Sequence, residues 1–257
     1  MKLAQFDLTG KVALVTGGTK GIGRALSLGL ASAGADVVVV SRHQDQCGAV
    51  AEEVRSLGQR GLGIAADVSS VTDAERVVSE TVRTLGGLHV LVNNAGVNSV
   101  QAANMVREDD WNKVIEINLK AVFFWSQAAA KEMITAGKGK IINISSVGGV
   151  IGESKMAAYA ASKAGVISLT KSLAREWGRY NIQVNGLGPG YVLTEMNEEA
   201  LKDEKVFNSI VSTIPLRRIG KVDDLIGPAV FLASTASDFV TGHTLFVDGG
   251  RLTGAKG

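Results

Sequence analysis

The chain has 257 residues, a formal net charge of +2 at pH 7 and a mean hydropathy of +0.18. This length fits one large α/β domain or two small ones, and the near balance of charge argues against a nucleic-acid partner. One cysteine, Cys47, excludes an intrachain disulfide framework and a cysteine-rich metal site. The first ten residues carry no apolar run of signal-peptide length, and no uninterrupted apolar run reaches about 18 residues. We therefore expect a cytoplasmic protein with no membrane partner.

The first half of the chain alternates short apolar segments with longer segments of helical periodicity. The expected strands cover residues 11–16, 36–41, 61–66 and 88–92. The expected helices cover residues 22–33, 44–57 and 72–85. Cys47 lies among polar residues after the second strand, and we expect it to be a partly exposed residue without a catalytic role, because no histidine adjoins it in the sequence.

The second half continues the alternation. The expected strands cover residues 140–144, 182–186 and 244–247, and the expected helices cover 108–135, 156–177 and 222–233. Strands that are apolar throughout and separated by helices predict a parallel sheet covered on both faces. We therefore predict an α/β protein with one domain over residues 1–257. Its core is a doubly wound (Rossmann) parallel sheet of about seven strands with helices on both faces. A polar, helix-prone insertion at about 191–218 follows a strand's carboxyl end, which favours a substrate lid.

The turn between the first strand and the first helix is rich in glycine. Gly17, Gly21 and Gly23 surround Thr19 and Lys20 there. Glycines at such a turn let the backbone approach a pyrophosphate at the positive end of a helix. A glycine-rich turn alone is a weak signal, but its place between a buried strand and a helix predicts a dinucleotide site.

The end of the second strand indicates which dinucleotide is bound. An acidic residue there bonds the ribose hydroxyl of NAD, whereas a cation accommodates the 2′-phosphate of NADP. This strand ends in Ser41 and Arg42, and no carboxylate follows until Asp45. Arg42 and Lys20 together would clamp a phosphate, with Ser41 as a hydrogen-bond donor. The sequence therefore favours NADP(H) over NAD(H).

A candidate acid–base group lies in the second half of the chain. Tyr159 and Lys163 are four residues apart, so both project from one face of the expected helix. An ammonium close to a phenol stabilises the phenolate and would lower the pKa of Tyr159 toward working pH. Ser146 lies in a loop after an apolar strand and would offer a hydroxyl to the same substrate oxygen.

Taken together, these motifs resemble the classical short-chain dehydrogenase/reductase family over nearly the whole chain. The resemblance rests on the ordered set Thr16 to Gly23, Asp67–Val68, Asn93 to Gly96, Asn118, Ser146, Tyr159, Lys163 and Pro189 to Thr194. It implies hydride transfer between a nicotinamide cofactor and a ketone or secondary alcohol, with no metal. It also implies a homotetramer. The two long helices carry alanine and other apolar residues all round, and such helices need cover beyond one face of a sheet.

The resemblance implies a role for each matching residue. The catalytic set is Asn118, Ser146, Tyr159 and Lys163, with Asn118 holding a water that links the lysine to solvent. The remaining residues are implied to hold the cofactor, with Asp67 and Val68 at the adenine ring and Val192 and Thr194 at the nicotinamide carboxamide. That cofactor set is Gly17, Thr19, Lys20, Gly21, Ile22, Gly23, Ser41, Arg42, Asp67, Val68, Asn94, Ala95, Gly96, Tyr159, Lys163, Pro189, Gly190, Val192 and Thr194. Asn93 is expected to tie strands together rather than to touch a ligand.

We expect the substrate to be a small molecule, and the sequence says less about its identity than about the fold or the cofactor. Besides Ser146, the expected contacts are Asn98, Glu153 and Tyr191, with Gly148, Val150 and Met196 nearby. The C-terminal third resembles the gluconate 5-dehydrogenase branch, which implies a sugar acid or polyol. One alternative is a 3-oxoacyl-(acyl-carrier-protein) reductase, which needs a basic patch such as Arg107, Lys113 and Arg175. A more remote alternative is a protein that senses NADP(H) without turnover.

Overall fold

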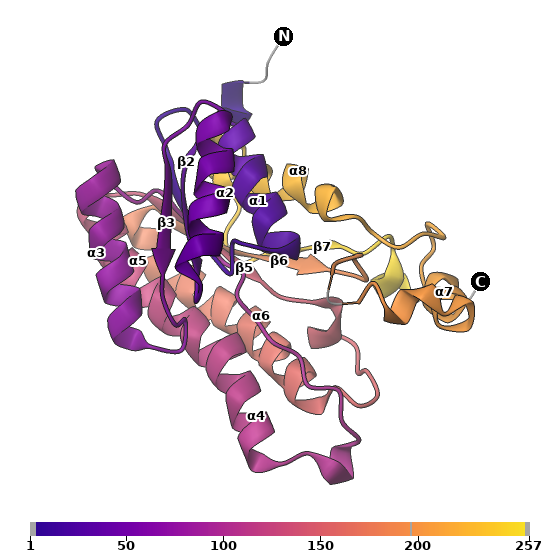
Figure 1. The fold of residues 1–257 in the computed structure, drawn as a ribbon. Helices are drawn as coiled ribbons and strands as arrows, with labels where there is room; N and C mark the ends of the chain where they lie inside the picture. Colours follow the sequence, from indigo (N-terminus) through magenta and orange to yellow (C-terminus); the bar gives the residue numbers. More distant parts are fainter. Residues whose placement is uncertain (1–3, 196, 255–257) are drawn as a thin grey trace.

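The structure is a computed structural model that describes residues 4–195 and 197–254. Its core is one sheet of seven parallel strands in the order β3-β2-β1-β4-β5-β6-β7 (Figure 1). The strands are β1 (Val12–Thr16), β2 (Asp36–Ser41), β3 (Gly61–Ala65), β4 (Val90–Asn93), β5 (Gly139–Ile144), β6 (Ile182–Pro189) and β7 (Thr244–Val247). The predicted doubly wound α/β fold is confirmed.

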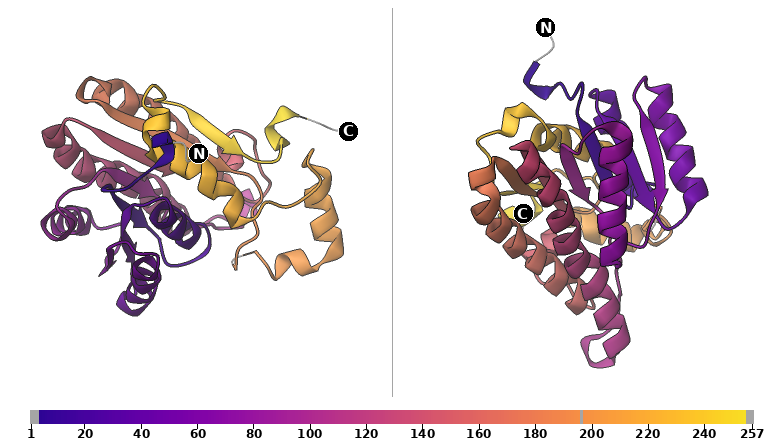
Figure 2. Two further views of the ribbon diagram at one scale, coloured as in Figure 1. Left: turned by 90° about the horizontal axis from the view of Figure 1, so that it is seen from above. Right: turned by 90° about the vertical axis from the view of Figure 1, so that its left-hand side faces the viewer.

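Helices cover both faces of the sheet (Figure 2). One apolar layer packs α1 (Gly21–Ser32), α2 (Gln44–Ser56) and α8 (Ile226–Ala233) against one face. The other layer packs α3 (Val71–Leu85), α5 (Ala121–Ala136) and α6 (Ala157–Trp177) against the opposite face. Because alternate residues of each strand point to opposite faces, strands covered on both faces, such as β1, need apolar side chains at most positions. This explains why the predicted strands lack alternating polarity.

The strand order reverses between β1 and β4, which are neighbours in the sheet although they are far apart in sequence. Connections that leave these two strands in opposite directions open a crevice at their carboxyl ends, and ligands of doubly wound folds bind there. All strands are parallel, so the loops after β1, β4, β5 and β6 reach this same edge.

The helix predicted at 108–135 differs from expectation in its middle. It consists of α4 (Glu108–Ile115), a π-helical segment η3 (Glu116–Lys120) and α5. The wider π-helical turn holds Asn118, whose fully buried side chain bonds the backbone of Val97. Such single π-turns inside α-helices are frequent at functional sites. The sequence signal for helix does not distinguish a π-turn from an α-turn, so periodicity could not predict it.

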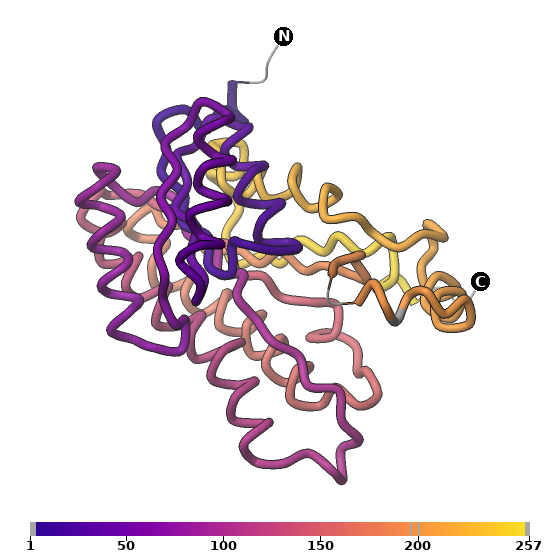
Figure 3. The backbone as a smooth tube through the Cα atoms, viewed as in Figure 1, coloured from indigo at the N-terminus to yellow at the C-terminus, as the bar shows by residue number. Residues whose placement is uncertain are grey.

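The insertion after β6 carries a helix α7 (Glu204–Ser212), none of whose described residues is buried. Its base is closed by a backbone bridge between Val192 and Gly220, with the Leu193 amide donating to the Gly220 carbonyl at 2.9 Å. Its far end lies beside the C-terminal segment, where the Leu216 amide donates to the Gly249 carbonyl at 3.1 Å (Figure 3). None of the described helices is long and apolar enough to cross a membrane.

The environment of His89 should make the stability of the folded protein depend on pH. Its Nδ1 accepts a hydrogen bond from the Val12 amide at 3.0 Å, and burial lowers its pKa from 6.5, with the charges of Lys11 and Lys138 adding to the effect. The unfolded chain therefore binds more protons, so stability is full above pH 6.5 and falls as the pH drops toward the lower folded pKa. Loss of the hydrogen bond costs about 1 kcal/mol.

We expect the melting temperature to fall between pH 7.5 and pH 5.5, and His89→Asn, whose amide oxygen still accepts but does not titrate, to reduce that fall. Thermal unfolding followed by circular dichroism at a series of pH values checks this. An equal fall in both proteins would contradict the assignment.

Candidate active site

A cleft of about 950 Å³ opens at the carboxyl ends of the strands, where the doubly wound fold places its ligand site. It joins the glycine turn at one end to the tyrosine–lysine pair at the other. The predicted residues in its wall are Gly17, Lys20, Gly21, Ile22, Gly23, Asn94, Ala95, Gly96, Asn98, Ser146, Glu153, Tyr159, Lys163, Pro189, Gly190, Tyr191, Val192 and Thr194. Gly148 and Val150 do not line it, and Met196 lies outside the described residues.

Two glycines of the turn, Gly17 and Gly23, are packed so tightly that they have no room for side chains. Gly17 has a φ of +62°, and a Cβ on Gly23 would lie 2.0 Å from the Gly17 carbonyl oxygen. The Asn94 amide group donates to the carbonyls of Thr16 and Gly17 at 3.0 and 3.1 Å, so this side chain fixes the turn. Lys20 precedes α1 without a side-chain cap, so the first amides of α1 remain available to an anion. The turn therefore fits a pyrophosphate.

The remaining predicted cofactor residues, Thr19, Ser41, Arg42, Asp67 and Val68, lie outside the wall of the cleft. They are nevertheless near the turn: the Gly18 amide donates to the Val40 carbonyl at 3.1 Å, and Ser41 pairs with Ala65 across β2 and β3. Arg42 is exposed at this edge. The fold thus leaves an open surface beside the turn, which suits the adenosine half of a dinucleotide.

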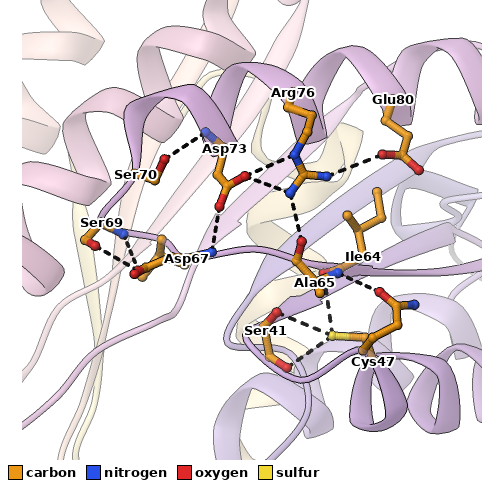
Figure 4. Close-up of polar contacts among 12 residues, drawn as sticks. Ser41, Cys47, Ile64, Ala65, Asp67, Ser69, Ser70, Asp73, Arg76 and Glu80 are labelled. Atoms are coloured by element: carbon orange, nitrogen blue, oxygen red, sulfur yellow. Dashed lines mark hydrogen bonds and ion pairs between the residues drawn. The ribbon is translucent and has the colours of Figure 1, made fainter.

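The ends of β2 and β3 are held by a polar network (Figure 4). The Asp67 carboxylate accepts from the amide and hydroxyl of Ser69 at 3.0 and 2.8 Å. The Asp73 carboxylate accepts from the Asp67 amide at 2.9 Å. The expectation for Cys47 is wrong in one respect: its side chain is fully buried, with Sγ 3.1 Å from the Ser41 hydroxyl. Its position on the inner face of α2 decides this, and the surrounding polar residues gave no sign of it.

At the other end of the cleft, Lys163 lies beside Tyr159. Lys163 is 4% exposed, and its Nζ donates to the Ile144 carbonyl at 2.8 Å and lies 5.7 Å from the centre of the Tyr159 ring. Ser146 accepts from the Gly148 amide at 3.1 Å and lies near enough to Tyr159 to lower the pKa of the phenol. The loop after β5 and one face of α6 thus bring together the hydroxyl, the phenol and the ammonium, as their spacing predicted.

The acid–base properties differ from the prediction. Burial raises the pKa of Tyr159, a hydrogen bond from Ser146 opposes that shift, and the charge of Glu153 adds to it. Burial also lowers the pKa of Lys163 to about 8. Burial is the largest influence on both groups, so the interval between Tyr159 and Lys163 does not bring the pKa of the phenol below its ordinary value. The inference from spacing failed because it took no account of burial, which acts on both groups.

The Asn118 side chain hydrogen-bonds the backbone of the loop after β4. Its Oδ1 accepts from the Val97 amide at 2.8 Å, and its Nδ2 donates to the Val97 carbonyl at 2.9 Å and to the Ser162 hydroxyl at 3.2 Å. It therefore fixes the position of Gly96, which lies next to Lys163. Asn93 bonds Asn143 and Ser126 at 2.9 Å each, so it ties strands and a helix together as expected.

Sequence reasoning missed two charged residues of the cleft, Glu195 and Arg251. The Arg251 guanidinium donates to the Glu153 carboxylate at 2.8 Å and stacks 4.5 Å from the centre of the Tyr191 ring. Arg251 belongs to a short 3-10 helix, η9 (Arg251–Thr253), just beyond the carboxyl end of β7. Its place after the last strand was the signal that could have revealed it, because every such position reaches the ligand edge of a parallel sheet.

The glycine turn gives a direct test by substitution. In Gly23→Ala the new methyl group would meet the Gly17 carbonyl and the Asn94 amide, so we expect a loss of roughly 1–3 kcal/mol of stability and weaker dinucleotide binding. Gly48→Ala is the matched control, because that glycine lies within α2 with nothing within 4 Å of the added carbon, and helix propensity favours alanine by about 0.5–1 kcal/mol. Urea unfolding and calorimetric titration with NADPH check both variants. A Gly23→Ala protein as stable and as tightly binding as Gly48→Ala would contradict the packing argument.

Comparisons with known proteins agree with this geometry. The model of the short chain dehydrogenase family matches residues 11–205. The 2-dehydro-3-deoxy-D-gluconate 5-dehydrogenase of Escherichia coli is 43% identical over 98% of this chain and 99% of its own length. A 3-oxoacyl-(acyl-carrier-protein) reductase of Staphylococcus aureus is 40% identical over 93% of this chain and 97% of its own.

Among solved structures, a gluconate 5-dehydrogenase from Burkholderia cenocepacia in complex with NADP and tartrate superimposes with a TM-score of 0.95. It is 41% identical, with 99% of this chain and 100% of that chain covered. The chain therefore belongs to the short-chain dehydrogenase family and is an NAD(P)-dependent oxidoreductase that acts on CH–OH groups.

Proposed function

We propose that this protein interconverts a 5-keto sugar acid and its secondary alcohol, with NADP(H) as the cofactor. The observation that carries the proposal is the grouping of Ser146, Tyr159 and Lys163 in the same cleft as the glycine turn. That cleft would hold a nicotinamide and a carbonyl carbon side by side. The cofactor, when bound, supplies or accepts the hydride.

In the proposed mechanism the protein handles the proton. Tyr159 donates its proton to the carbonyl oxygen during reduction, which suits a phenol whose pKa is raised and which is therefore protonated at neutral pH. Ser146 donates a hydrogen bond to the same oxygen and stabilises the charge that develops there. The phenolate left behind is stabilised by the protonated Lys163, and Asn118 holds the loop through which a water chain would return the proton. Alcohol oxidation is the reverse and requires Tyr159 as the phenolate.

The cofactor would lie along the cleft and over the open surface beside it. Amides of the turn from Gly17 to Gly23, Thr19 included, would hold the pyrophosphate, and Arg42, Lys20 and Ser41 would hold the 2′-phosphate. Asp67 and Val68 would meet the adenine. Asn94, Ala95 and Gly96 would pass beside the ribose, which Lys163 also reaches, and the segment with Pro189, Gly190, Val192 and Thr194 would meet the carboxamide. Thr194 lies close to the glycine turn, since a Cβ added to Gly21 would be 3.5 Å from the Thr194 side chain. This proximity supports the arrangement.

Charge favours a small acid over an acyl carrier protein as substrate. The carrier-protein alternative needs a basic patch, yet Arg107 is paired with Asp110 at 2.9 Å, and the first turn of α4 also holds Glu108 and Asp109. These carboxylates weaken the attraction of this face for an acidic carrier, although Lys113 of the same helix adds a positive charge. A sugar acid is consistent with the names of the E. coli and B. cenocepacia relatives.

The remaining expectations rest on the family resemblance and on the shape of the insertion. We propose that the protein is a cytoplasmic homotetramer, in which the apolar residues around α5 and α6 find cover between subunits. We also propose that residues 191–218 form a lid over the substrate. No described residue of α7 is buried, and this lack of packing supports a segment able to close.

The proposal is tested by following NADPH absorbance with a panel of carbonyl compounds. We expect the largest kcat/KM with 5-keto-D-gluconate, a lower value with simple diketones and the lowest with acetoacetyl thioesters. A preference for the thioester would favour the carrier-protein alternative. NADPH binding without turnover of any compound would favour a protein that senses the cofactor.

Tyr159→Phe tests the proton donor. Removing the hydroxyl should lower kcat by about 10²- to 10⁴-fold, because the phenol is the group proposed to transfer the proton. NADPH binding, measured by fluorescence titration, should change little. Turnover close to that of the unmodified protein would refute the mechanism.

Arg42→Gln tests the cofactor preference. Loss of a charge-assisted contact to the 2′-phosphate should raise the KM for NADPH about 10- to 100-fold while leaving the KM for NADH unchanged. Arg42→Lys keeps the charge, so its KM for NADPH should lie between that of the unmodified protein and that of Arg42→Gln. Equal changes with both cofactors would show that Arg42 does not read the phosphate.

A further inference from the structure

Three side chains from distant segments meet in the substrate half of the cleft. Glu153 comes from the loop after β5, Tyr191 follows β6, and Arg251 follows β7. The Arg251 guanidinium bonds one oxygen of Glu153 at 2.8 Å, and the Tyr191 hydroxyl lies 3.5 Å from the other. The guanidinium also stacks on the Tyr191 ring. These three residues are called here the Arg251 group.

The Arg251 group is largely shielded from water. The side chains of Arg251 and Glu153 are 12% and 15% exposed, and both line the cleft. A buried ion pair is a poor source of stability, because desolvation offsets most of its attraction. The charge of Glu153 reaches Tyr159, whose pKa it helps to raise. The group therefore lies within electrostatic range of the proposed proton donor.

The backbone around Arg251 is held rigidly. The Asp248 carboxylate accepts from the amides of Gly250 and Leu252 at 2.9 and 2.8 Å, which fixes the turn into η9. A guanidinium held in this way loses little conformational freedom when a ligand arrives.

Only a few cations are available to an anionic substrate. Among the described residues that line the cleft, the basic ones are Lys20, Lys163 and Arg251. Lys20 belongs to the glycine turn at the cofactor end, and Lys163 is buried beside Tyr159 with its ammonium on a backbone carbonyl. Arg251 remains, and its planar fork of donors matches a carboxylate better than a lysine would.

We propose that Arg251, positioned by Glu153 and Tyr191, binds the carboxylate of the substrate and makes the enzyme select sugar acids over neutral ketoses. The inference rests on the function proposed above and names the residue that recognises the acid. Glu153 orients the guanidinium and accepts from a neighbouring sugar hydroxyl, and the Tyr191 ring holds the guanidinium plane.

Kinetics with two matched ketoses test this assignment. L-Sorbose has the carbon skeleton of 5-keto-D-gluconate with a hydroxymethyl group in place of the carboxylate. Arg251→Gln should raise the KM for 5-keto-D-gluconate about 10- to 100-fold with a smaller change in kcat, and should change kcat/KM for L-sorbose less than about threefold. Arg251→Lys keeps the charge but not the planar fork of donors, so its KM for 5-keto-D-gluconate should lie between that of the unmodified protein and that of Arg251→Gln.

Arg179→Gln is the matched control. Arg179 stacks on Tyr180 with its guanidinium carbon 4.7 Å from the ring centre, as Arg251 does on Tyr191, but it lies after α6 and does not line the cleft. It should behave like the unmodified protein with both ketoses. Equal losses with both ketoses in Arg251→Gln, or no loss with either, would overturn the assignment.

Tartrate binding provides a readout that does not depend on turnover. With NADP⁺ present, calorimetry should detect tartrate binding to the unmodified protein and to Arg179→Gln, and binding to Arg251→Gln should be at least about tenfold weaker. If 5-keto-D-gluconate is not reduced but tartrate binding still depends on Arg251, the proposed substrate is wrong and the carboxylate site stands. If 5-keto-D-gluconate is reduced and neither its KM nor tartrate binding depends on Arg251, the carboxylate site is wrong and the proposed function stands.

Discussion

Burial of the Lys163 ammonium is the constraint on which the proposed chemistry of this protein depends. The ammonium lies against the Ile144 carbonyl at the end of β5, next to Tyr159 and close to Gly96. Removing it from water lowers its pKa to about 8, so at neutral pH it is charged but close to losing that charge. In the proposed reaction this charge acts after the phenol has given up its proton, where a buried phenolate needs a cation beside it. Lysine thus stabilises the product of proton transfer rather than the resting tyrosine.

The rest of the fold brings this pair to one edge of the sheet. A parallel sheet sends the loops after β1, β4, β5 and β6 to the same side, and internal side chains then lock those loops. Asn94 holds the glycine turn, and Asn118, in the π-helical turn, holds the loop after β4. Both asparagines bond backbone groups, so their contribution in this structure is to position the cleft. The chemistry is therefore carried by few residues and supported by many hydrogen bonds.

Much of this was predictable from the sequence, because strand and helix periodicity, glycine spacing and the Tyr159–Lys163 interval are local signals. What could not be predicted depends on burial or on contacts between distant segments. The raised pKa of Tyr159 and the buried Cys47 follow from packing that no local pattern records. Arg251 meets Glu153 only because β7 ends beside the loop after β5 across the cleft. Substrate recognition is the least local property of all, and it was the least predictable.

The pH dependence of carbonyl reduction tests the role of Lys163 most directly. The profile of kcat/KM reports groups of the enzyme before the carbonyl substrate binds. The account predicts that kcat/KM for reduction with saturating NADPH falls as the pH rises and Lys163, whose pKa burial lowers, loses its proton. That fall should come well below the pH at which the phenol titrates. A value that stays level until the phenol itself titrates, above its ordinary pKa of 10.0, would contradict it.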